Sequence, residues 1–203
     1  MSRCIATEGQ QDVGYLLIPT LWDDTIAERT RETLGELLTG DALLGLVIDM
    51  RINGGGAYTE LYDLLSLFTE GEVGAFLRRG SERSPLTLEA NPLHNSQDIP
   101  LVILVGRDTE SYAEIFSGAL QATGRARLVG RATAGNVESV YPYDLEDGSR
   151  LWLAEETFVP LTGTPWEEEG VQPDVLVDGE WEDFTDENDP YIAAALAILL
   201  GEK

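Results

Sequence analysis

The sequence predicts an α/β fold, in which a mainly parallel sheet is layered with helices and carries one β-hairpin excursion. Two continuous apolar runs of strand length, at residues 43–50 and 100–106, are typical of strands covered on both faces. Each run is followed by a glycine-rich or polar loop and then by an amphipathic stretch. Because strand, helix and strand alternate twice, crossover connections with parallel pairing are the expected arrangement.

The first half of the chain supplies three strands and two helices. The helix at 22–40 has Asp23 or Asp24 as its cap and an apolar face that includes Ile26 and Leu34. Residues 80–99 are polar and rich in turn formers, which predicts a short hairpin or a surface excursion. The remaining elements are strands at 14–19, 43–50 and 72–79, a loop at 51–56 and a helix at 57–71.

The second half repeats this order and ends in a helix. Asp189 is the expected cap of that helix, with Pro190 at its first position. Asp147 and Gly148 form the turn of a hairpin. The elements are strands at 100–106 and 126–130, a helix at 110–124, hairpin strands at 138–145 and 149–156, a loop with a short final strand at 162–177, and a helix at 190–202.

Length and composition predict a polar leader at residues 1–12 and a single core domain at 13–203. The formal charge of −24 argues against nucleic acid or an anionic membrane as partner. Cys4 is the single cysteine, so no intrachain disulfide can form. No membrane span, cofactor or metal site is expected. The first residues lack an apolar signal segment, which favours a cytoplasmic location, or an extracytoplasmic one if the chain is a piece of an exported protein.

Two loops follow the apolar strands, at the edge of a parallel sheet where ligands bind. The first is "RINGGG", whose Gly54, Gly55 and Gly56 amides can hold an oxyanion. The second is "GRDTES", which places Ser111 at the positive end of a helix, next to the Tyr112 amide as a second donor. The alternative is a simple helix cap and a simple turn. A phosphate site is excluded because the loop lacks the required lysine and spacing.

Several motifs follow one another as in a known family. They are "GYLLIPTLWDDTIAERTRETLGELL", "GLVIDMRINGGG", "PLVILVGRDTESYAEIFSGALQATGRARLVGRATAG", "DGSRLW" and "GVQPDVLV". Over residues 13–178 the chain resembles the C-terminal processing (tail-specific) serine peptidases of family S41. The resemblance implies a fold akin to the Clp protease and crotonase superfamily, and cleavage of polypeptides, often near their C-termini. By position, Ser111 is the implied nucleophile, and Gly56 and Tyr112 the implied oxyanion hole.

The general base is where the chain departs from that family. The family lysine aligns with Asn136 in "TAGNVES", and the single lysine of the chain is Lys203. An amide cannot accept the serine proton, so a serine–lysine dyad within the chain is excluded. In the related tricorn-type peptidases a histidine takes this role, and it aligns with Leu16 or Leu17 here. The lone histidine, His94, lies in a polar excursion and is expected at the surface.

The other candidates for the base are carboxylates or groups from outside the chain. Glu114, Glu138 and Glu167 are the carboxylates; Glu167 lies near the place of a supporting glutamate in tricorn-type enzymes. A base from outside the chain could come from a missing N-terminal segment or from a neighbouring subunit of a homo-oligomer. Family members commonly carry an N-terminal region and a PDZ domain. Three hypotheses follow: a serine peptidase acting on polypeptides, a catalytically silent peptide-binding relative, and, by fold analogy alone, an acyl-thioester enzyme.

Overall fold

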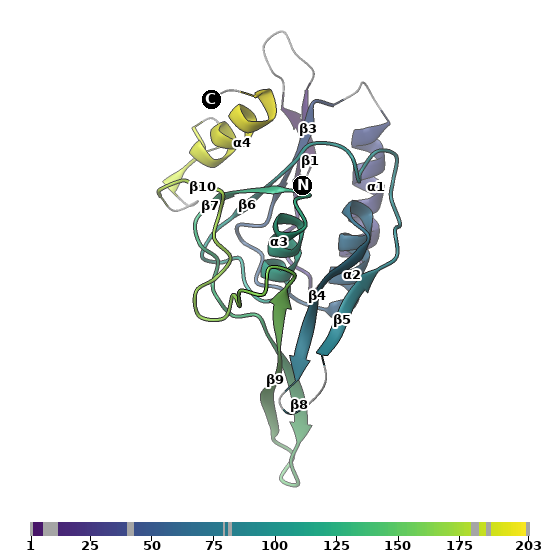
Figure 1. Cartoon of the computed structure of the whole chain (residues 1–203), viewed down its shortest axis with the longest axis vertical. Helices are drawn as coiled ribbons and strands as arrows, with labels where there is room; N and C mark the ends of the chain where they lie inside the picture. The colour runs from purple at the N-terminus through teal and green to yellow at the C-terminus, as the bar shows by residue number, and fades with distance from the viewer. Residues whose placement is uncertain are drawn as a thin grey trace.

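The computed structural model describes residues 2–5, 12–39, 43–78, 80, 83–179, 183–185 and 188–201. Within these ranges the chain forms two sheets and four helices (Figure 1). The larger sheet has the strand order β1-β2-β3-β6-β7-β10, and the smaller one the order β5-β4-β9-β8. The predicted α/β class with a mainly parallel sheet is therefore confirmed.

The larger sheet is parallel except at its first strand, β1, which pairs antiparallel with β2. Every residue of β3 and β6 is buried, as their continuous apolar sequences predicted. Strand β1 lies within the stretch expected to be a polar leader, and the sequence analysis did not predict it. The strands are β1 (Ser2–Ile5), β2 (Val13–Leu17), β3 (Gly45–Asp49), β6 (Leu101–Val105), β7 (Arg127–Gly130) and β10 (Val175–Leu176).

Helices cover both faces of this sheet. Leu46 and Ile48 of β3 belong to a large apolar cluster beneath α1, α2 and α3, whereas Val47 between them belongs to a smaller cluster beneath α4. This alternation follows from the two-residue period of a strand. No helix in the described part of the chain is long and apolar enough to cross a membrane. The helices are α1 (Ile26–Leu38), α2 (Tyr58–Phe68), α3 (Tyr112–Ala122) and α4 (Pro190–Leu200).

The capping predictions have different outcomes at the two ends of the chain. Thr25, and not Asp23 or Asp24, is the N-cap of α1; the Asp23 carboxylate accepts hydrogen bonds from the Thr25 amide and hydroxyl. Asp189 caps α4 as predicted, because its Oδ1 accepts a hydrogen bond from the Tyr191 amide at 2.9 Å. Both carboxylates therefore lie at helix N-termini, where negative charge is stabilising.

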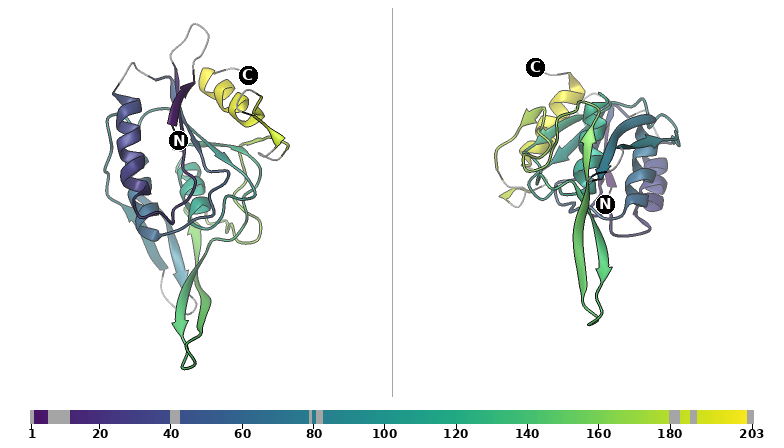
Figure 2. Two further views of the ribbon diagram at one scale, coloured as in Figure 1. Left: turned by 180° about the vertical axis from the view of Figure 1, so that it is seen from behind. Right: turned by 60° about the horizontal axis from the view of Figure 1, so that its bottom comes forward.

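The smaller sheet is antiparallel throughout and includes the predicted hairpin. Strand β9 pairs with β4 only over residues 156–160, so the rest of the β8–β9 hairpin is a two-stranded ribbon. This ribbon extends away from the layered body in every view (Figures 1 and 2). The strands are β4 (Gly71–Arg78), β5 (Arg83–Leu88), β8 (Glu138–Asp144) and β9 (Arg150–Pro160).

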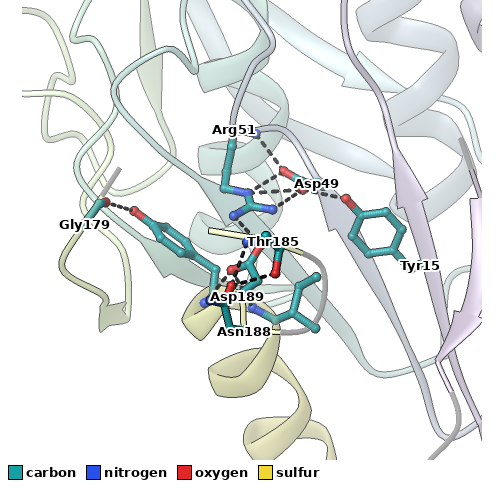
Figure 3. A network of polar contacts seen from close by, with 9 residues as sticks. Tyr15, Asp49, Arg51, Gly179, Thr185, Asn188 and Asp189 are labelled. Carbon is teal, nitrogen blue, oxygen red and sulfur yellow. Dashed lines mark hydrogen bonds and ion pairs between the residues drawn. The ribbon is translucent and has the colours of Figure 1, made fainter. Parts of the chain in front are cut away.

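A buried ionic network ties α4 to the carboxyl end of β3 (Figure 3). The Arg51 guanidinium contacts Asp49 Oδ2 at 2.7 Å and Asp189 Oδ2 at 2.7 Å, and it lies over the Tyr191 ring. Tyr15 donates its hydroxyl proton to Asp49 Oδ2 at 2.7 Å. Burial and the neighbouring Asp49 charge raise the pKa of Tyr15. Since Arg51 is the first residue of the "RINGGG" loop, this network holds both the helix and the start of that loop.

Candidate active site

Three loops meet at the carboxyl ends of β3, β6 and β7, and buried polar groups join them. The Thr109 hydroxyl donates to the Met50 carbonyl at 2.9 Å, and the Thr109 carbonyl accepts from the Ala134 amide at 3.0 Å. The Glu110 amide donates to the Asn53 carbonyl at 3.0 Å. The loops that follow the three strands therefore form one assembly. The first two are the loops that the sequence predicted to meet at the site.

Ser111 lies directly against the triple-glycine turn. A Cβ atom built on Gly55 would lie 2.7 Å from the Ser111 Cβ and 3.1 Å from the Tyr112 nitrogen. Ser111 is the N-cap of α3 and has φ 58° and ψ −127°, a conformation that L-residues other than glycine rarely adopt. Strained backbone of this kind is concentrated at functional sites. The fold thus presents a serine at a helix N-terminus beside a glycine turn.

The amides around Ser111 are not equally available to a ligand. The Gly55 amide donates to Asn53 Oδ1 at 2.9 Å, and Asn53 is itself fixed by donating to the Ile18 carbonyl. Among the hydrogen bonds of the described residues, none comes from the amides of Gly56 or Tyr112. Those two amides therefore remain available to a ligand, while the Gly55 turn lies against Ser111.

Gly55→Ala is expected to destabilise the fold and to displace Ser111. The residue has φ 85°, and the added Cβ would lie 2.9 Å from the Glu110 carbonyl oxygen, which is backbone and cannot move aside. A positive φ in a non-glycine residue costs about 1–3 kcal/mol before any clash is counted. Urea unfolding measures this cost. Gly54→Ala is the matched control, because a Cβ at Gly54 meets nothing within 4 Å, and equal losses in both variants would contradict the prediction.

Glu114, one turn after Ser111, ties the serine to the loop after β7. This carboxylate is fully buried and accepts four hydrogen bonds. The donors are the Ser111 amide at 3.0 Å, the Thr133 hydroxyl at 2.5 Å, the Gly135 amide at 2.7 Å and the Asn136 amide at 3.0 Å. These four contacts fix the position of the carboxylate between α3 and the loop after β7. Its contacts indicate that Glu114 organises the site.

Asn136 lies in this loop, and its side chain is directed to the neighbour of Ser111. Its Nδ2 donates to Glu110 Oε1 at 2.6 Å. Asn136 is exposed and Glu110 is half-buried. The structure therefore pairs the position of the expected lysine with a carboxylate, a partner that the sequence analysis did not identify.

The two remaining candidates for the base, Glu138 and Glu167, differ in their exposure and in their contacts. Glu138 is exposed at the start of β8. Glu167 Oε2 accepts the Val137 amide at 3.0 Å. Burial, together with Glu138, Glu114 and Glu168, raises the pKa of Glu167. Among the hydrogen bonds of the described residues, none joins the Ser111 hydroxyl to Glu138 or Glu167.

His94 and Lys203 stand apart from this assembly. His94 is exposed, as expected, in the turn before β6, whereas Ser111 follows the opposite end of that strand. Lys203 lies outside the described residues. Leu16 is buried in β2, and Leu17 forms the end of that strand beside Asp49.

The raised pKa of Glu167 predicts a pH-dependent effect of Glu167→Gln. A carboxyl whose pKa is higher in the folded state stabilises the fold below its unfolded pKa, about 4.3, and loses this contribution as pH rises through the folded value. The melting temperature of Glu167→Gln, relative to the parent, should therefore increase between pH 4 and pH 7. Glu169→Gln, an exposed acid of the same turn, is the control. A difference that does not vary with pH would contradict the assignment.

Comparison with known proteins places these loops in a family context. The model of peptidase family S41 matches residues 12–177. A probable CtpA-like serine protease of Staphylococcus aureus is 28% identical over 161 residues, which cover 76% of this chain and 32% of that protein. A chloroplastic C-terminal processing peptidase of Tetradesmus obliquus is 28% identical over 172 residues, covering 84% and 36%. The chain spans about a third of the length of these curated relatives.

Solved structures agree with this result. The photosystem II D1 C-terminal processing protease superposes with a TM-score of 0.76 and 27% identity, covering 84% of this chain and 43% of that one. The tricorn protease superposes with a TM-score of 0.62 and 22% identity, covering 93% of this chain and 18% of that one, and shows likeness of fold.

Proposed function

The chain belongs to peptidase family S41, and on that premise we propose that it is the core of a serine peptidase that cleaves polypeptides with Ser111 as nucleophile. The observation that carries the proposal is the close approach of Ser111 to the Gly55 turn. A Cβ built on Gly55 would lie only 2.7 Å from the Ser111 Cβ. Two relatives are named as C-terminal processing proteases. We propose that this chain likewise cleaves polypeptides near their C-termini.

The proposed chemistry is acyl transfer. The Ser111 oxygen attacks the carbonyl carbon of a peptide bond, and the carbonyl oxygen takes up the negative charge. The free amides of Gly56 and Tyr112 bind that oxyanion, and the N-terminus of α3 adds a favourable dipole. The C–N bond then breaks: the amine leaves with the proton that Ser111 gave to a base, and Ser111 holds the acyl group as an ester. Water hydrolyses this ester, which releases the new carboxyl terminus and returns a proton to Ser111.

The weak point of this site is the proton acceptor. Position 136 carries a neutral amide, and its Nδ2 donates to Glu110. Absence of a general base lowers a rate by about 10²- to 10⁴-fold. We therefore propose that the chain turns over slowly unless a base comes from Glu138, Glu167, a neighbouring subunit or a segment preceding this one.

Reaction with a fluorophosphonate probe tests the nucleophile. The probe should label the parent chain at Ser111, as located by mass spectrometry, and Ser111→Ala should lose the label completely. Ser149→Ala, in the exposed turn of the hairpin, should retain it. A parent chain that never reacts, or that reacts at another residue, would rule out Ser111 as an activated nucleophile.

A catalytically silent, peptide-binding relative is the second candidate. The observation that favours it is the Asn136–Glu110 hydrogen bond. A neutral amide, which cannot take the serine proton, occupies position 136 and is held there by Glu110. Calorimetry with unstructured, apolar-tailed peptides should then give heat of binding without product on later mass analysis. Product formation that Ser111→Ala abolishes would exclude this candidate.

A further inference from the structure

The body of the molecule contacts the two-stranded ribbon of the smaller sheet only near its base, through Tyr112 on Ser139 and through Arg78 on Tyr141 and Glu155. We define the arm as residues 138–155, which comprise β8, the turn and the part of β9 that does not pair with β4. The arm extends away from the larger sheet and its helices (Figures 1 and 2). An isolated two-stranded hairpin is only marginally stable in water. Such an element gains stability when something binds to it.

Both faces of the arm expose apolar side chains. Tyr143 is opposite Leu151 on one face, and Pro142 is opposite Trp152 on the other. Trp152 is 54% exposed and Leu151 is 45% exposed. Large apolar groups gathered on an exposed surface mark an interaction site. A globular body covers one face of a ribbon more readily than both, whereas an extended chain can wrap around it.

The β8 edge of the arm is not suited to strand addition. β8 is the edge strand of the smaller sheet, and Pro142 lies in its middle. A proline cannot donate to a hydrogen-bond ladder and blunts an edge strand. Strand addition is therefore disfavoured at the β8 edge. Residues 150–155 of β9 pair with β8 alone, so their other backbone edge is open, and the exposed side chains of both faces lie beside it.

The arm is continuous with the candidate active site. β8 begins at Glu138, two residues after Asn136. The Ser139 hydroxyl lies 3.2 Å from the Tyr112 hydroxyl, and Tyr112 follows Ser111 in the chain. A polypeptide that leaves the site along the arm would thus remain in contact with exposed apolar side chains.

The charge of the arm indicates what kind of polypeptide suits it. Residues 138–155 contain five acidic residues and one arginine, Arg150. Arg150 is paired with Asp144 at 2.6 Å, and Arg78 of β4 is paired with Glu155, so the unpaired acids of the arm are Glu138, Glu146 and Asp147 among the described residues. Complementary potentials favour a partner that carries lysine or arginine between its apolar residues. A second copy of this chain would bring an equally acidic arm and would be repelled.

We propose that the arm is a binding surface for extended polypeptide substrates that combine apolar side chains with lysine or arginine. The inference rests on the proposed function, because it identifies the occupant as the substrate of that site. It adds a substrate class that the catalytic loops do not define. The arm holds the flanking segment while the bond to be cut lies beside Ser111.

Binding to the uncleaving Ser111→Ala chain tests the arm separately from chemistry. The measurement is fluorescence anisotropy of a labelled, unstructured peptide of leucine, phenylalanine, lysine and serine, with a glutamate-for-lysine peptide in parallel. Tyr143→Ser/Leu151→Ser should weaken binding of the lysine peptide about tenfold or more. Trp152→Ser, on the opposite face of the arm, should also weaken binding of the lysine peptide. Leu176→Ser, an exposed leucine on β10, is the control and should change nothing.

The outcomes separate this inference from the proposed function. Equal affinity for the lysine and glutamate peptides, or unchanged affinity in both arm variants, overturns the inference even if the probe labels Ser111. Arm-dependent binding in a chain that the probe never labels supports the arm and rejects the peptidase. If sedimentation shows a dimer that only the arm variants dissociate, with peptide affinity unchanged, the arm is an interface between copies and the inference fails. Circular dichroism confirms that each variant is folded.

Discussion

Asn136→Lys combined with Glu110→Gln is expected to raise cleavage of an unstructured polypeptide about 10²- to 10⁴-fold over the parent, the range for a gained general base. Asn136→Lys alone should gain far less. The reason is the 2.6 Å contact between Asn136 Nδ2 and Glu110 Oε1, which would place a lysine amine beside a carboxylate. An adjacent negative charge favours the charged ammonium, and a charged ammonium cannot accept the serine proton.

The measurement is the initial rate of product formation, with five chains compared. The matched control is Asn136→Gln with Glu110→Gln, which removes the same carboxylate without adding an amine. Ser111→Ala in the double variant should return the rate to background. If the double variant is no faster than its control while Ser111 still reacts with the probe, the acceptor position is not at residue 136.

Arg51→Met is expected to lower the free energy of unfolding by about 3–5 kcal/mol, as for a buried ion pair that loses one partner. Arg51 contacts Asp49 and Asp189 at 2.7 Å each, and all three side chains are less than a tenth exposed. Without the guanidinium, two carboxylates remain buried with reduced compensation. Because Asp189 begins α4 and Arg51 begins the glycine loop, the helix and the loop should loosen together.

Urea unfolding followed by tryptophan fluorescence and circular dichroism measures this loss. Asp189→Asn should cost less than Arg51→Met, because asparagine also caps helices well. Tyr15→Phe removes one hydrogen bond to Asp49 and should cost about 1.5–3 kcal/mol, the range for bonds to charged groups. If Arg51→Met lowers the free energy of unfolding by less than Tyr15→Phe does, the network contributes little to stability.

Sequence reasoning succeeded where local pattern decides the structure. The strands β3 and β6 follow from their continuous apolar residues, and the hairpin follows from Asp147 and Gly148 between two β-prone stretches. Sequence reasoning failed for β1, whose four residues alternate between exposed and half-buried and give a weak signal. It also did not predict that β9 joins β4, because pairing between segments so far apart in the chain has no local signature.

The same division applies to the candidate site. Sequence placed Ser111 and the glycines at adjacent strand ends, but it offered Gly55 as an oxyanion donor and Glu114 as a base. In the structure the Gly55 amide is engaged by Asn53, and Glu114 accepts four hydrogen bonds. The role of Asn53, the asparagine of "RINGGG", could not be predicted from the sequence, because it depends on the hydrogen bonds that its side chain makes with Ile18 and Gly55.

The sequence by itself determined the layered α/β class, the acidic charge and the neutral side chain at position 136. These depend on residue type and on spacing along the chain, which strands and helices translate directly into buried and exposed faces. The tertiary structure alone decided which amides near Ser111 are free, that Asn136 faces Glu110, and that Arg51 joins α4 to the glycine loop. Hydrogen-bond partners of buried polar groups come from distant segments, so only their meeting in space assigns them.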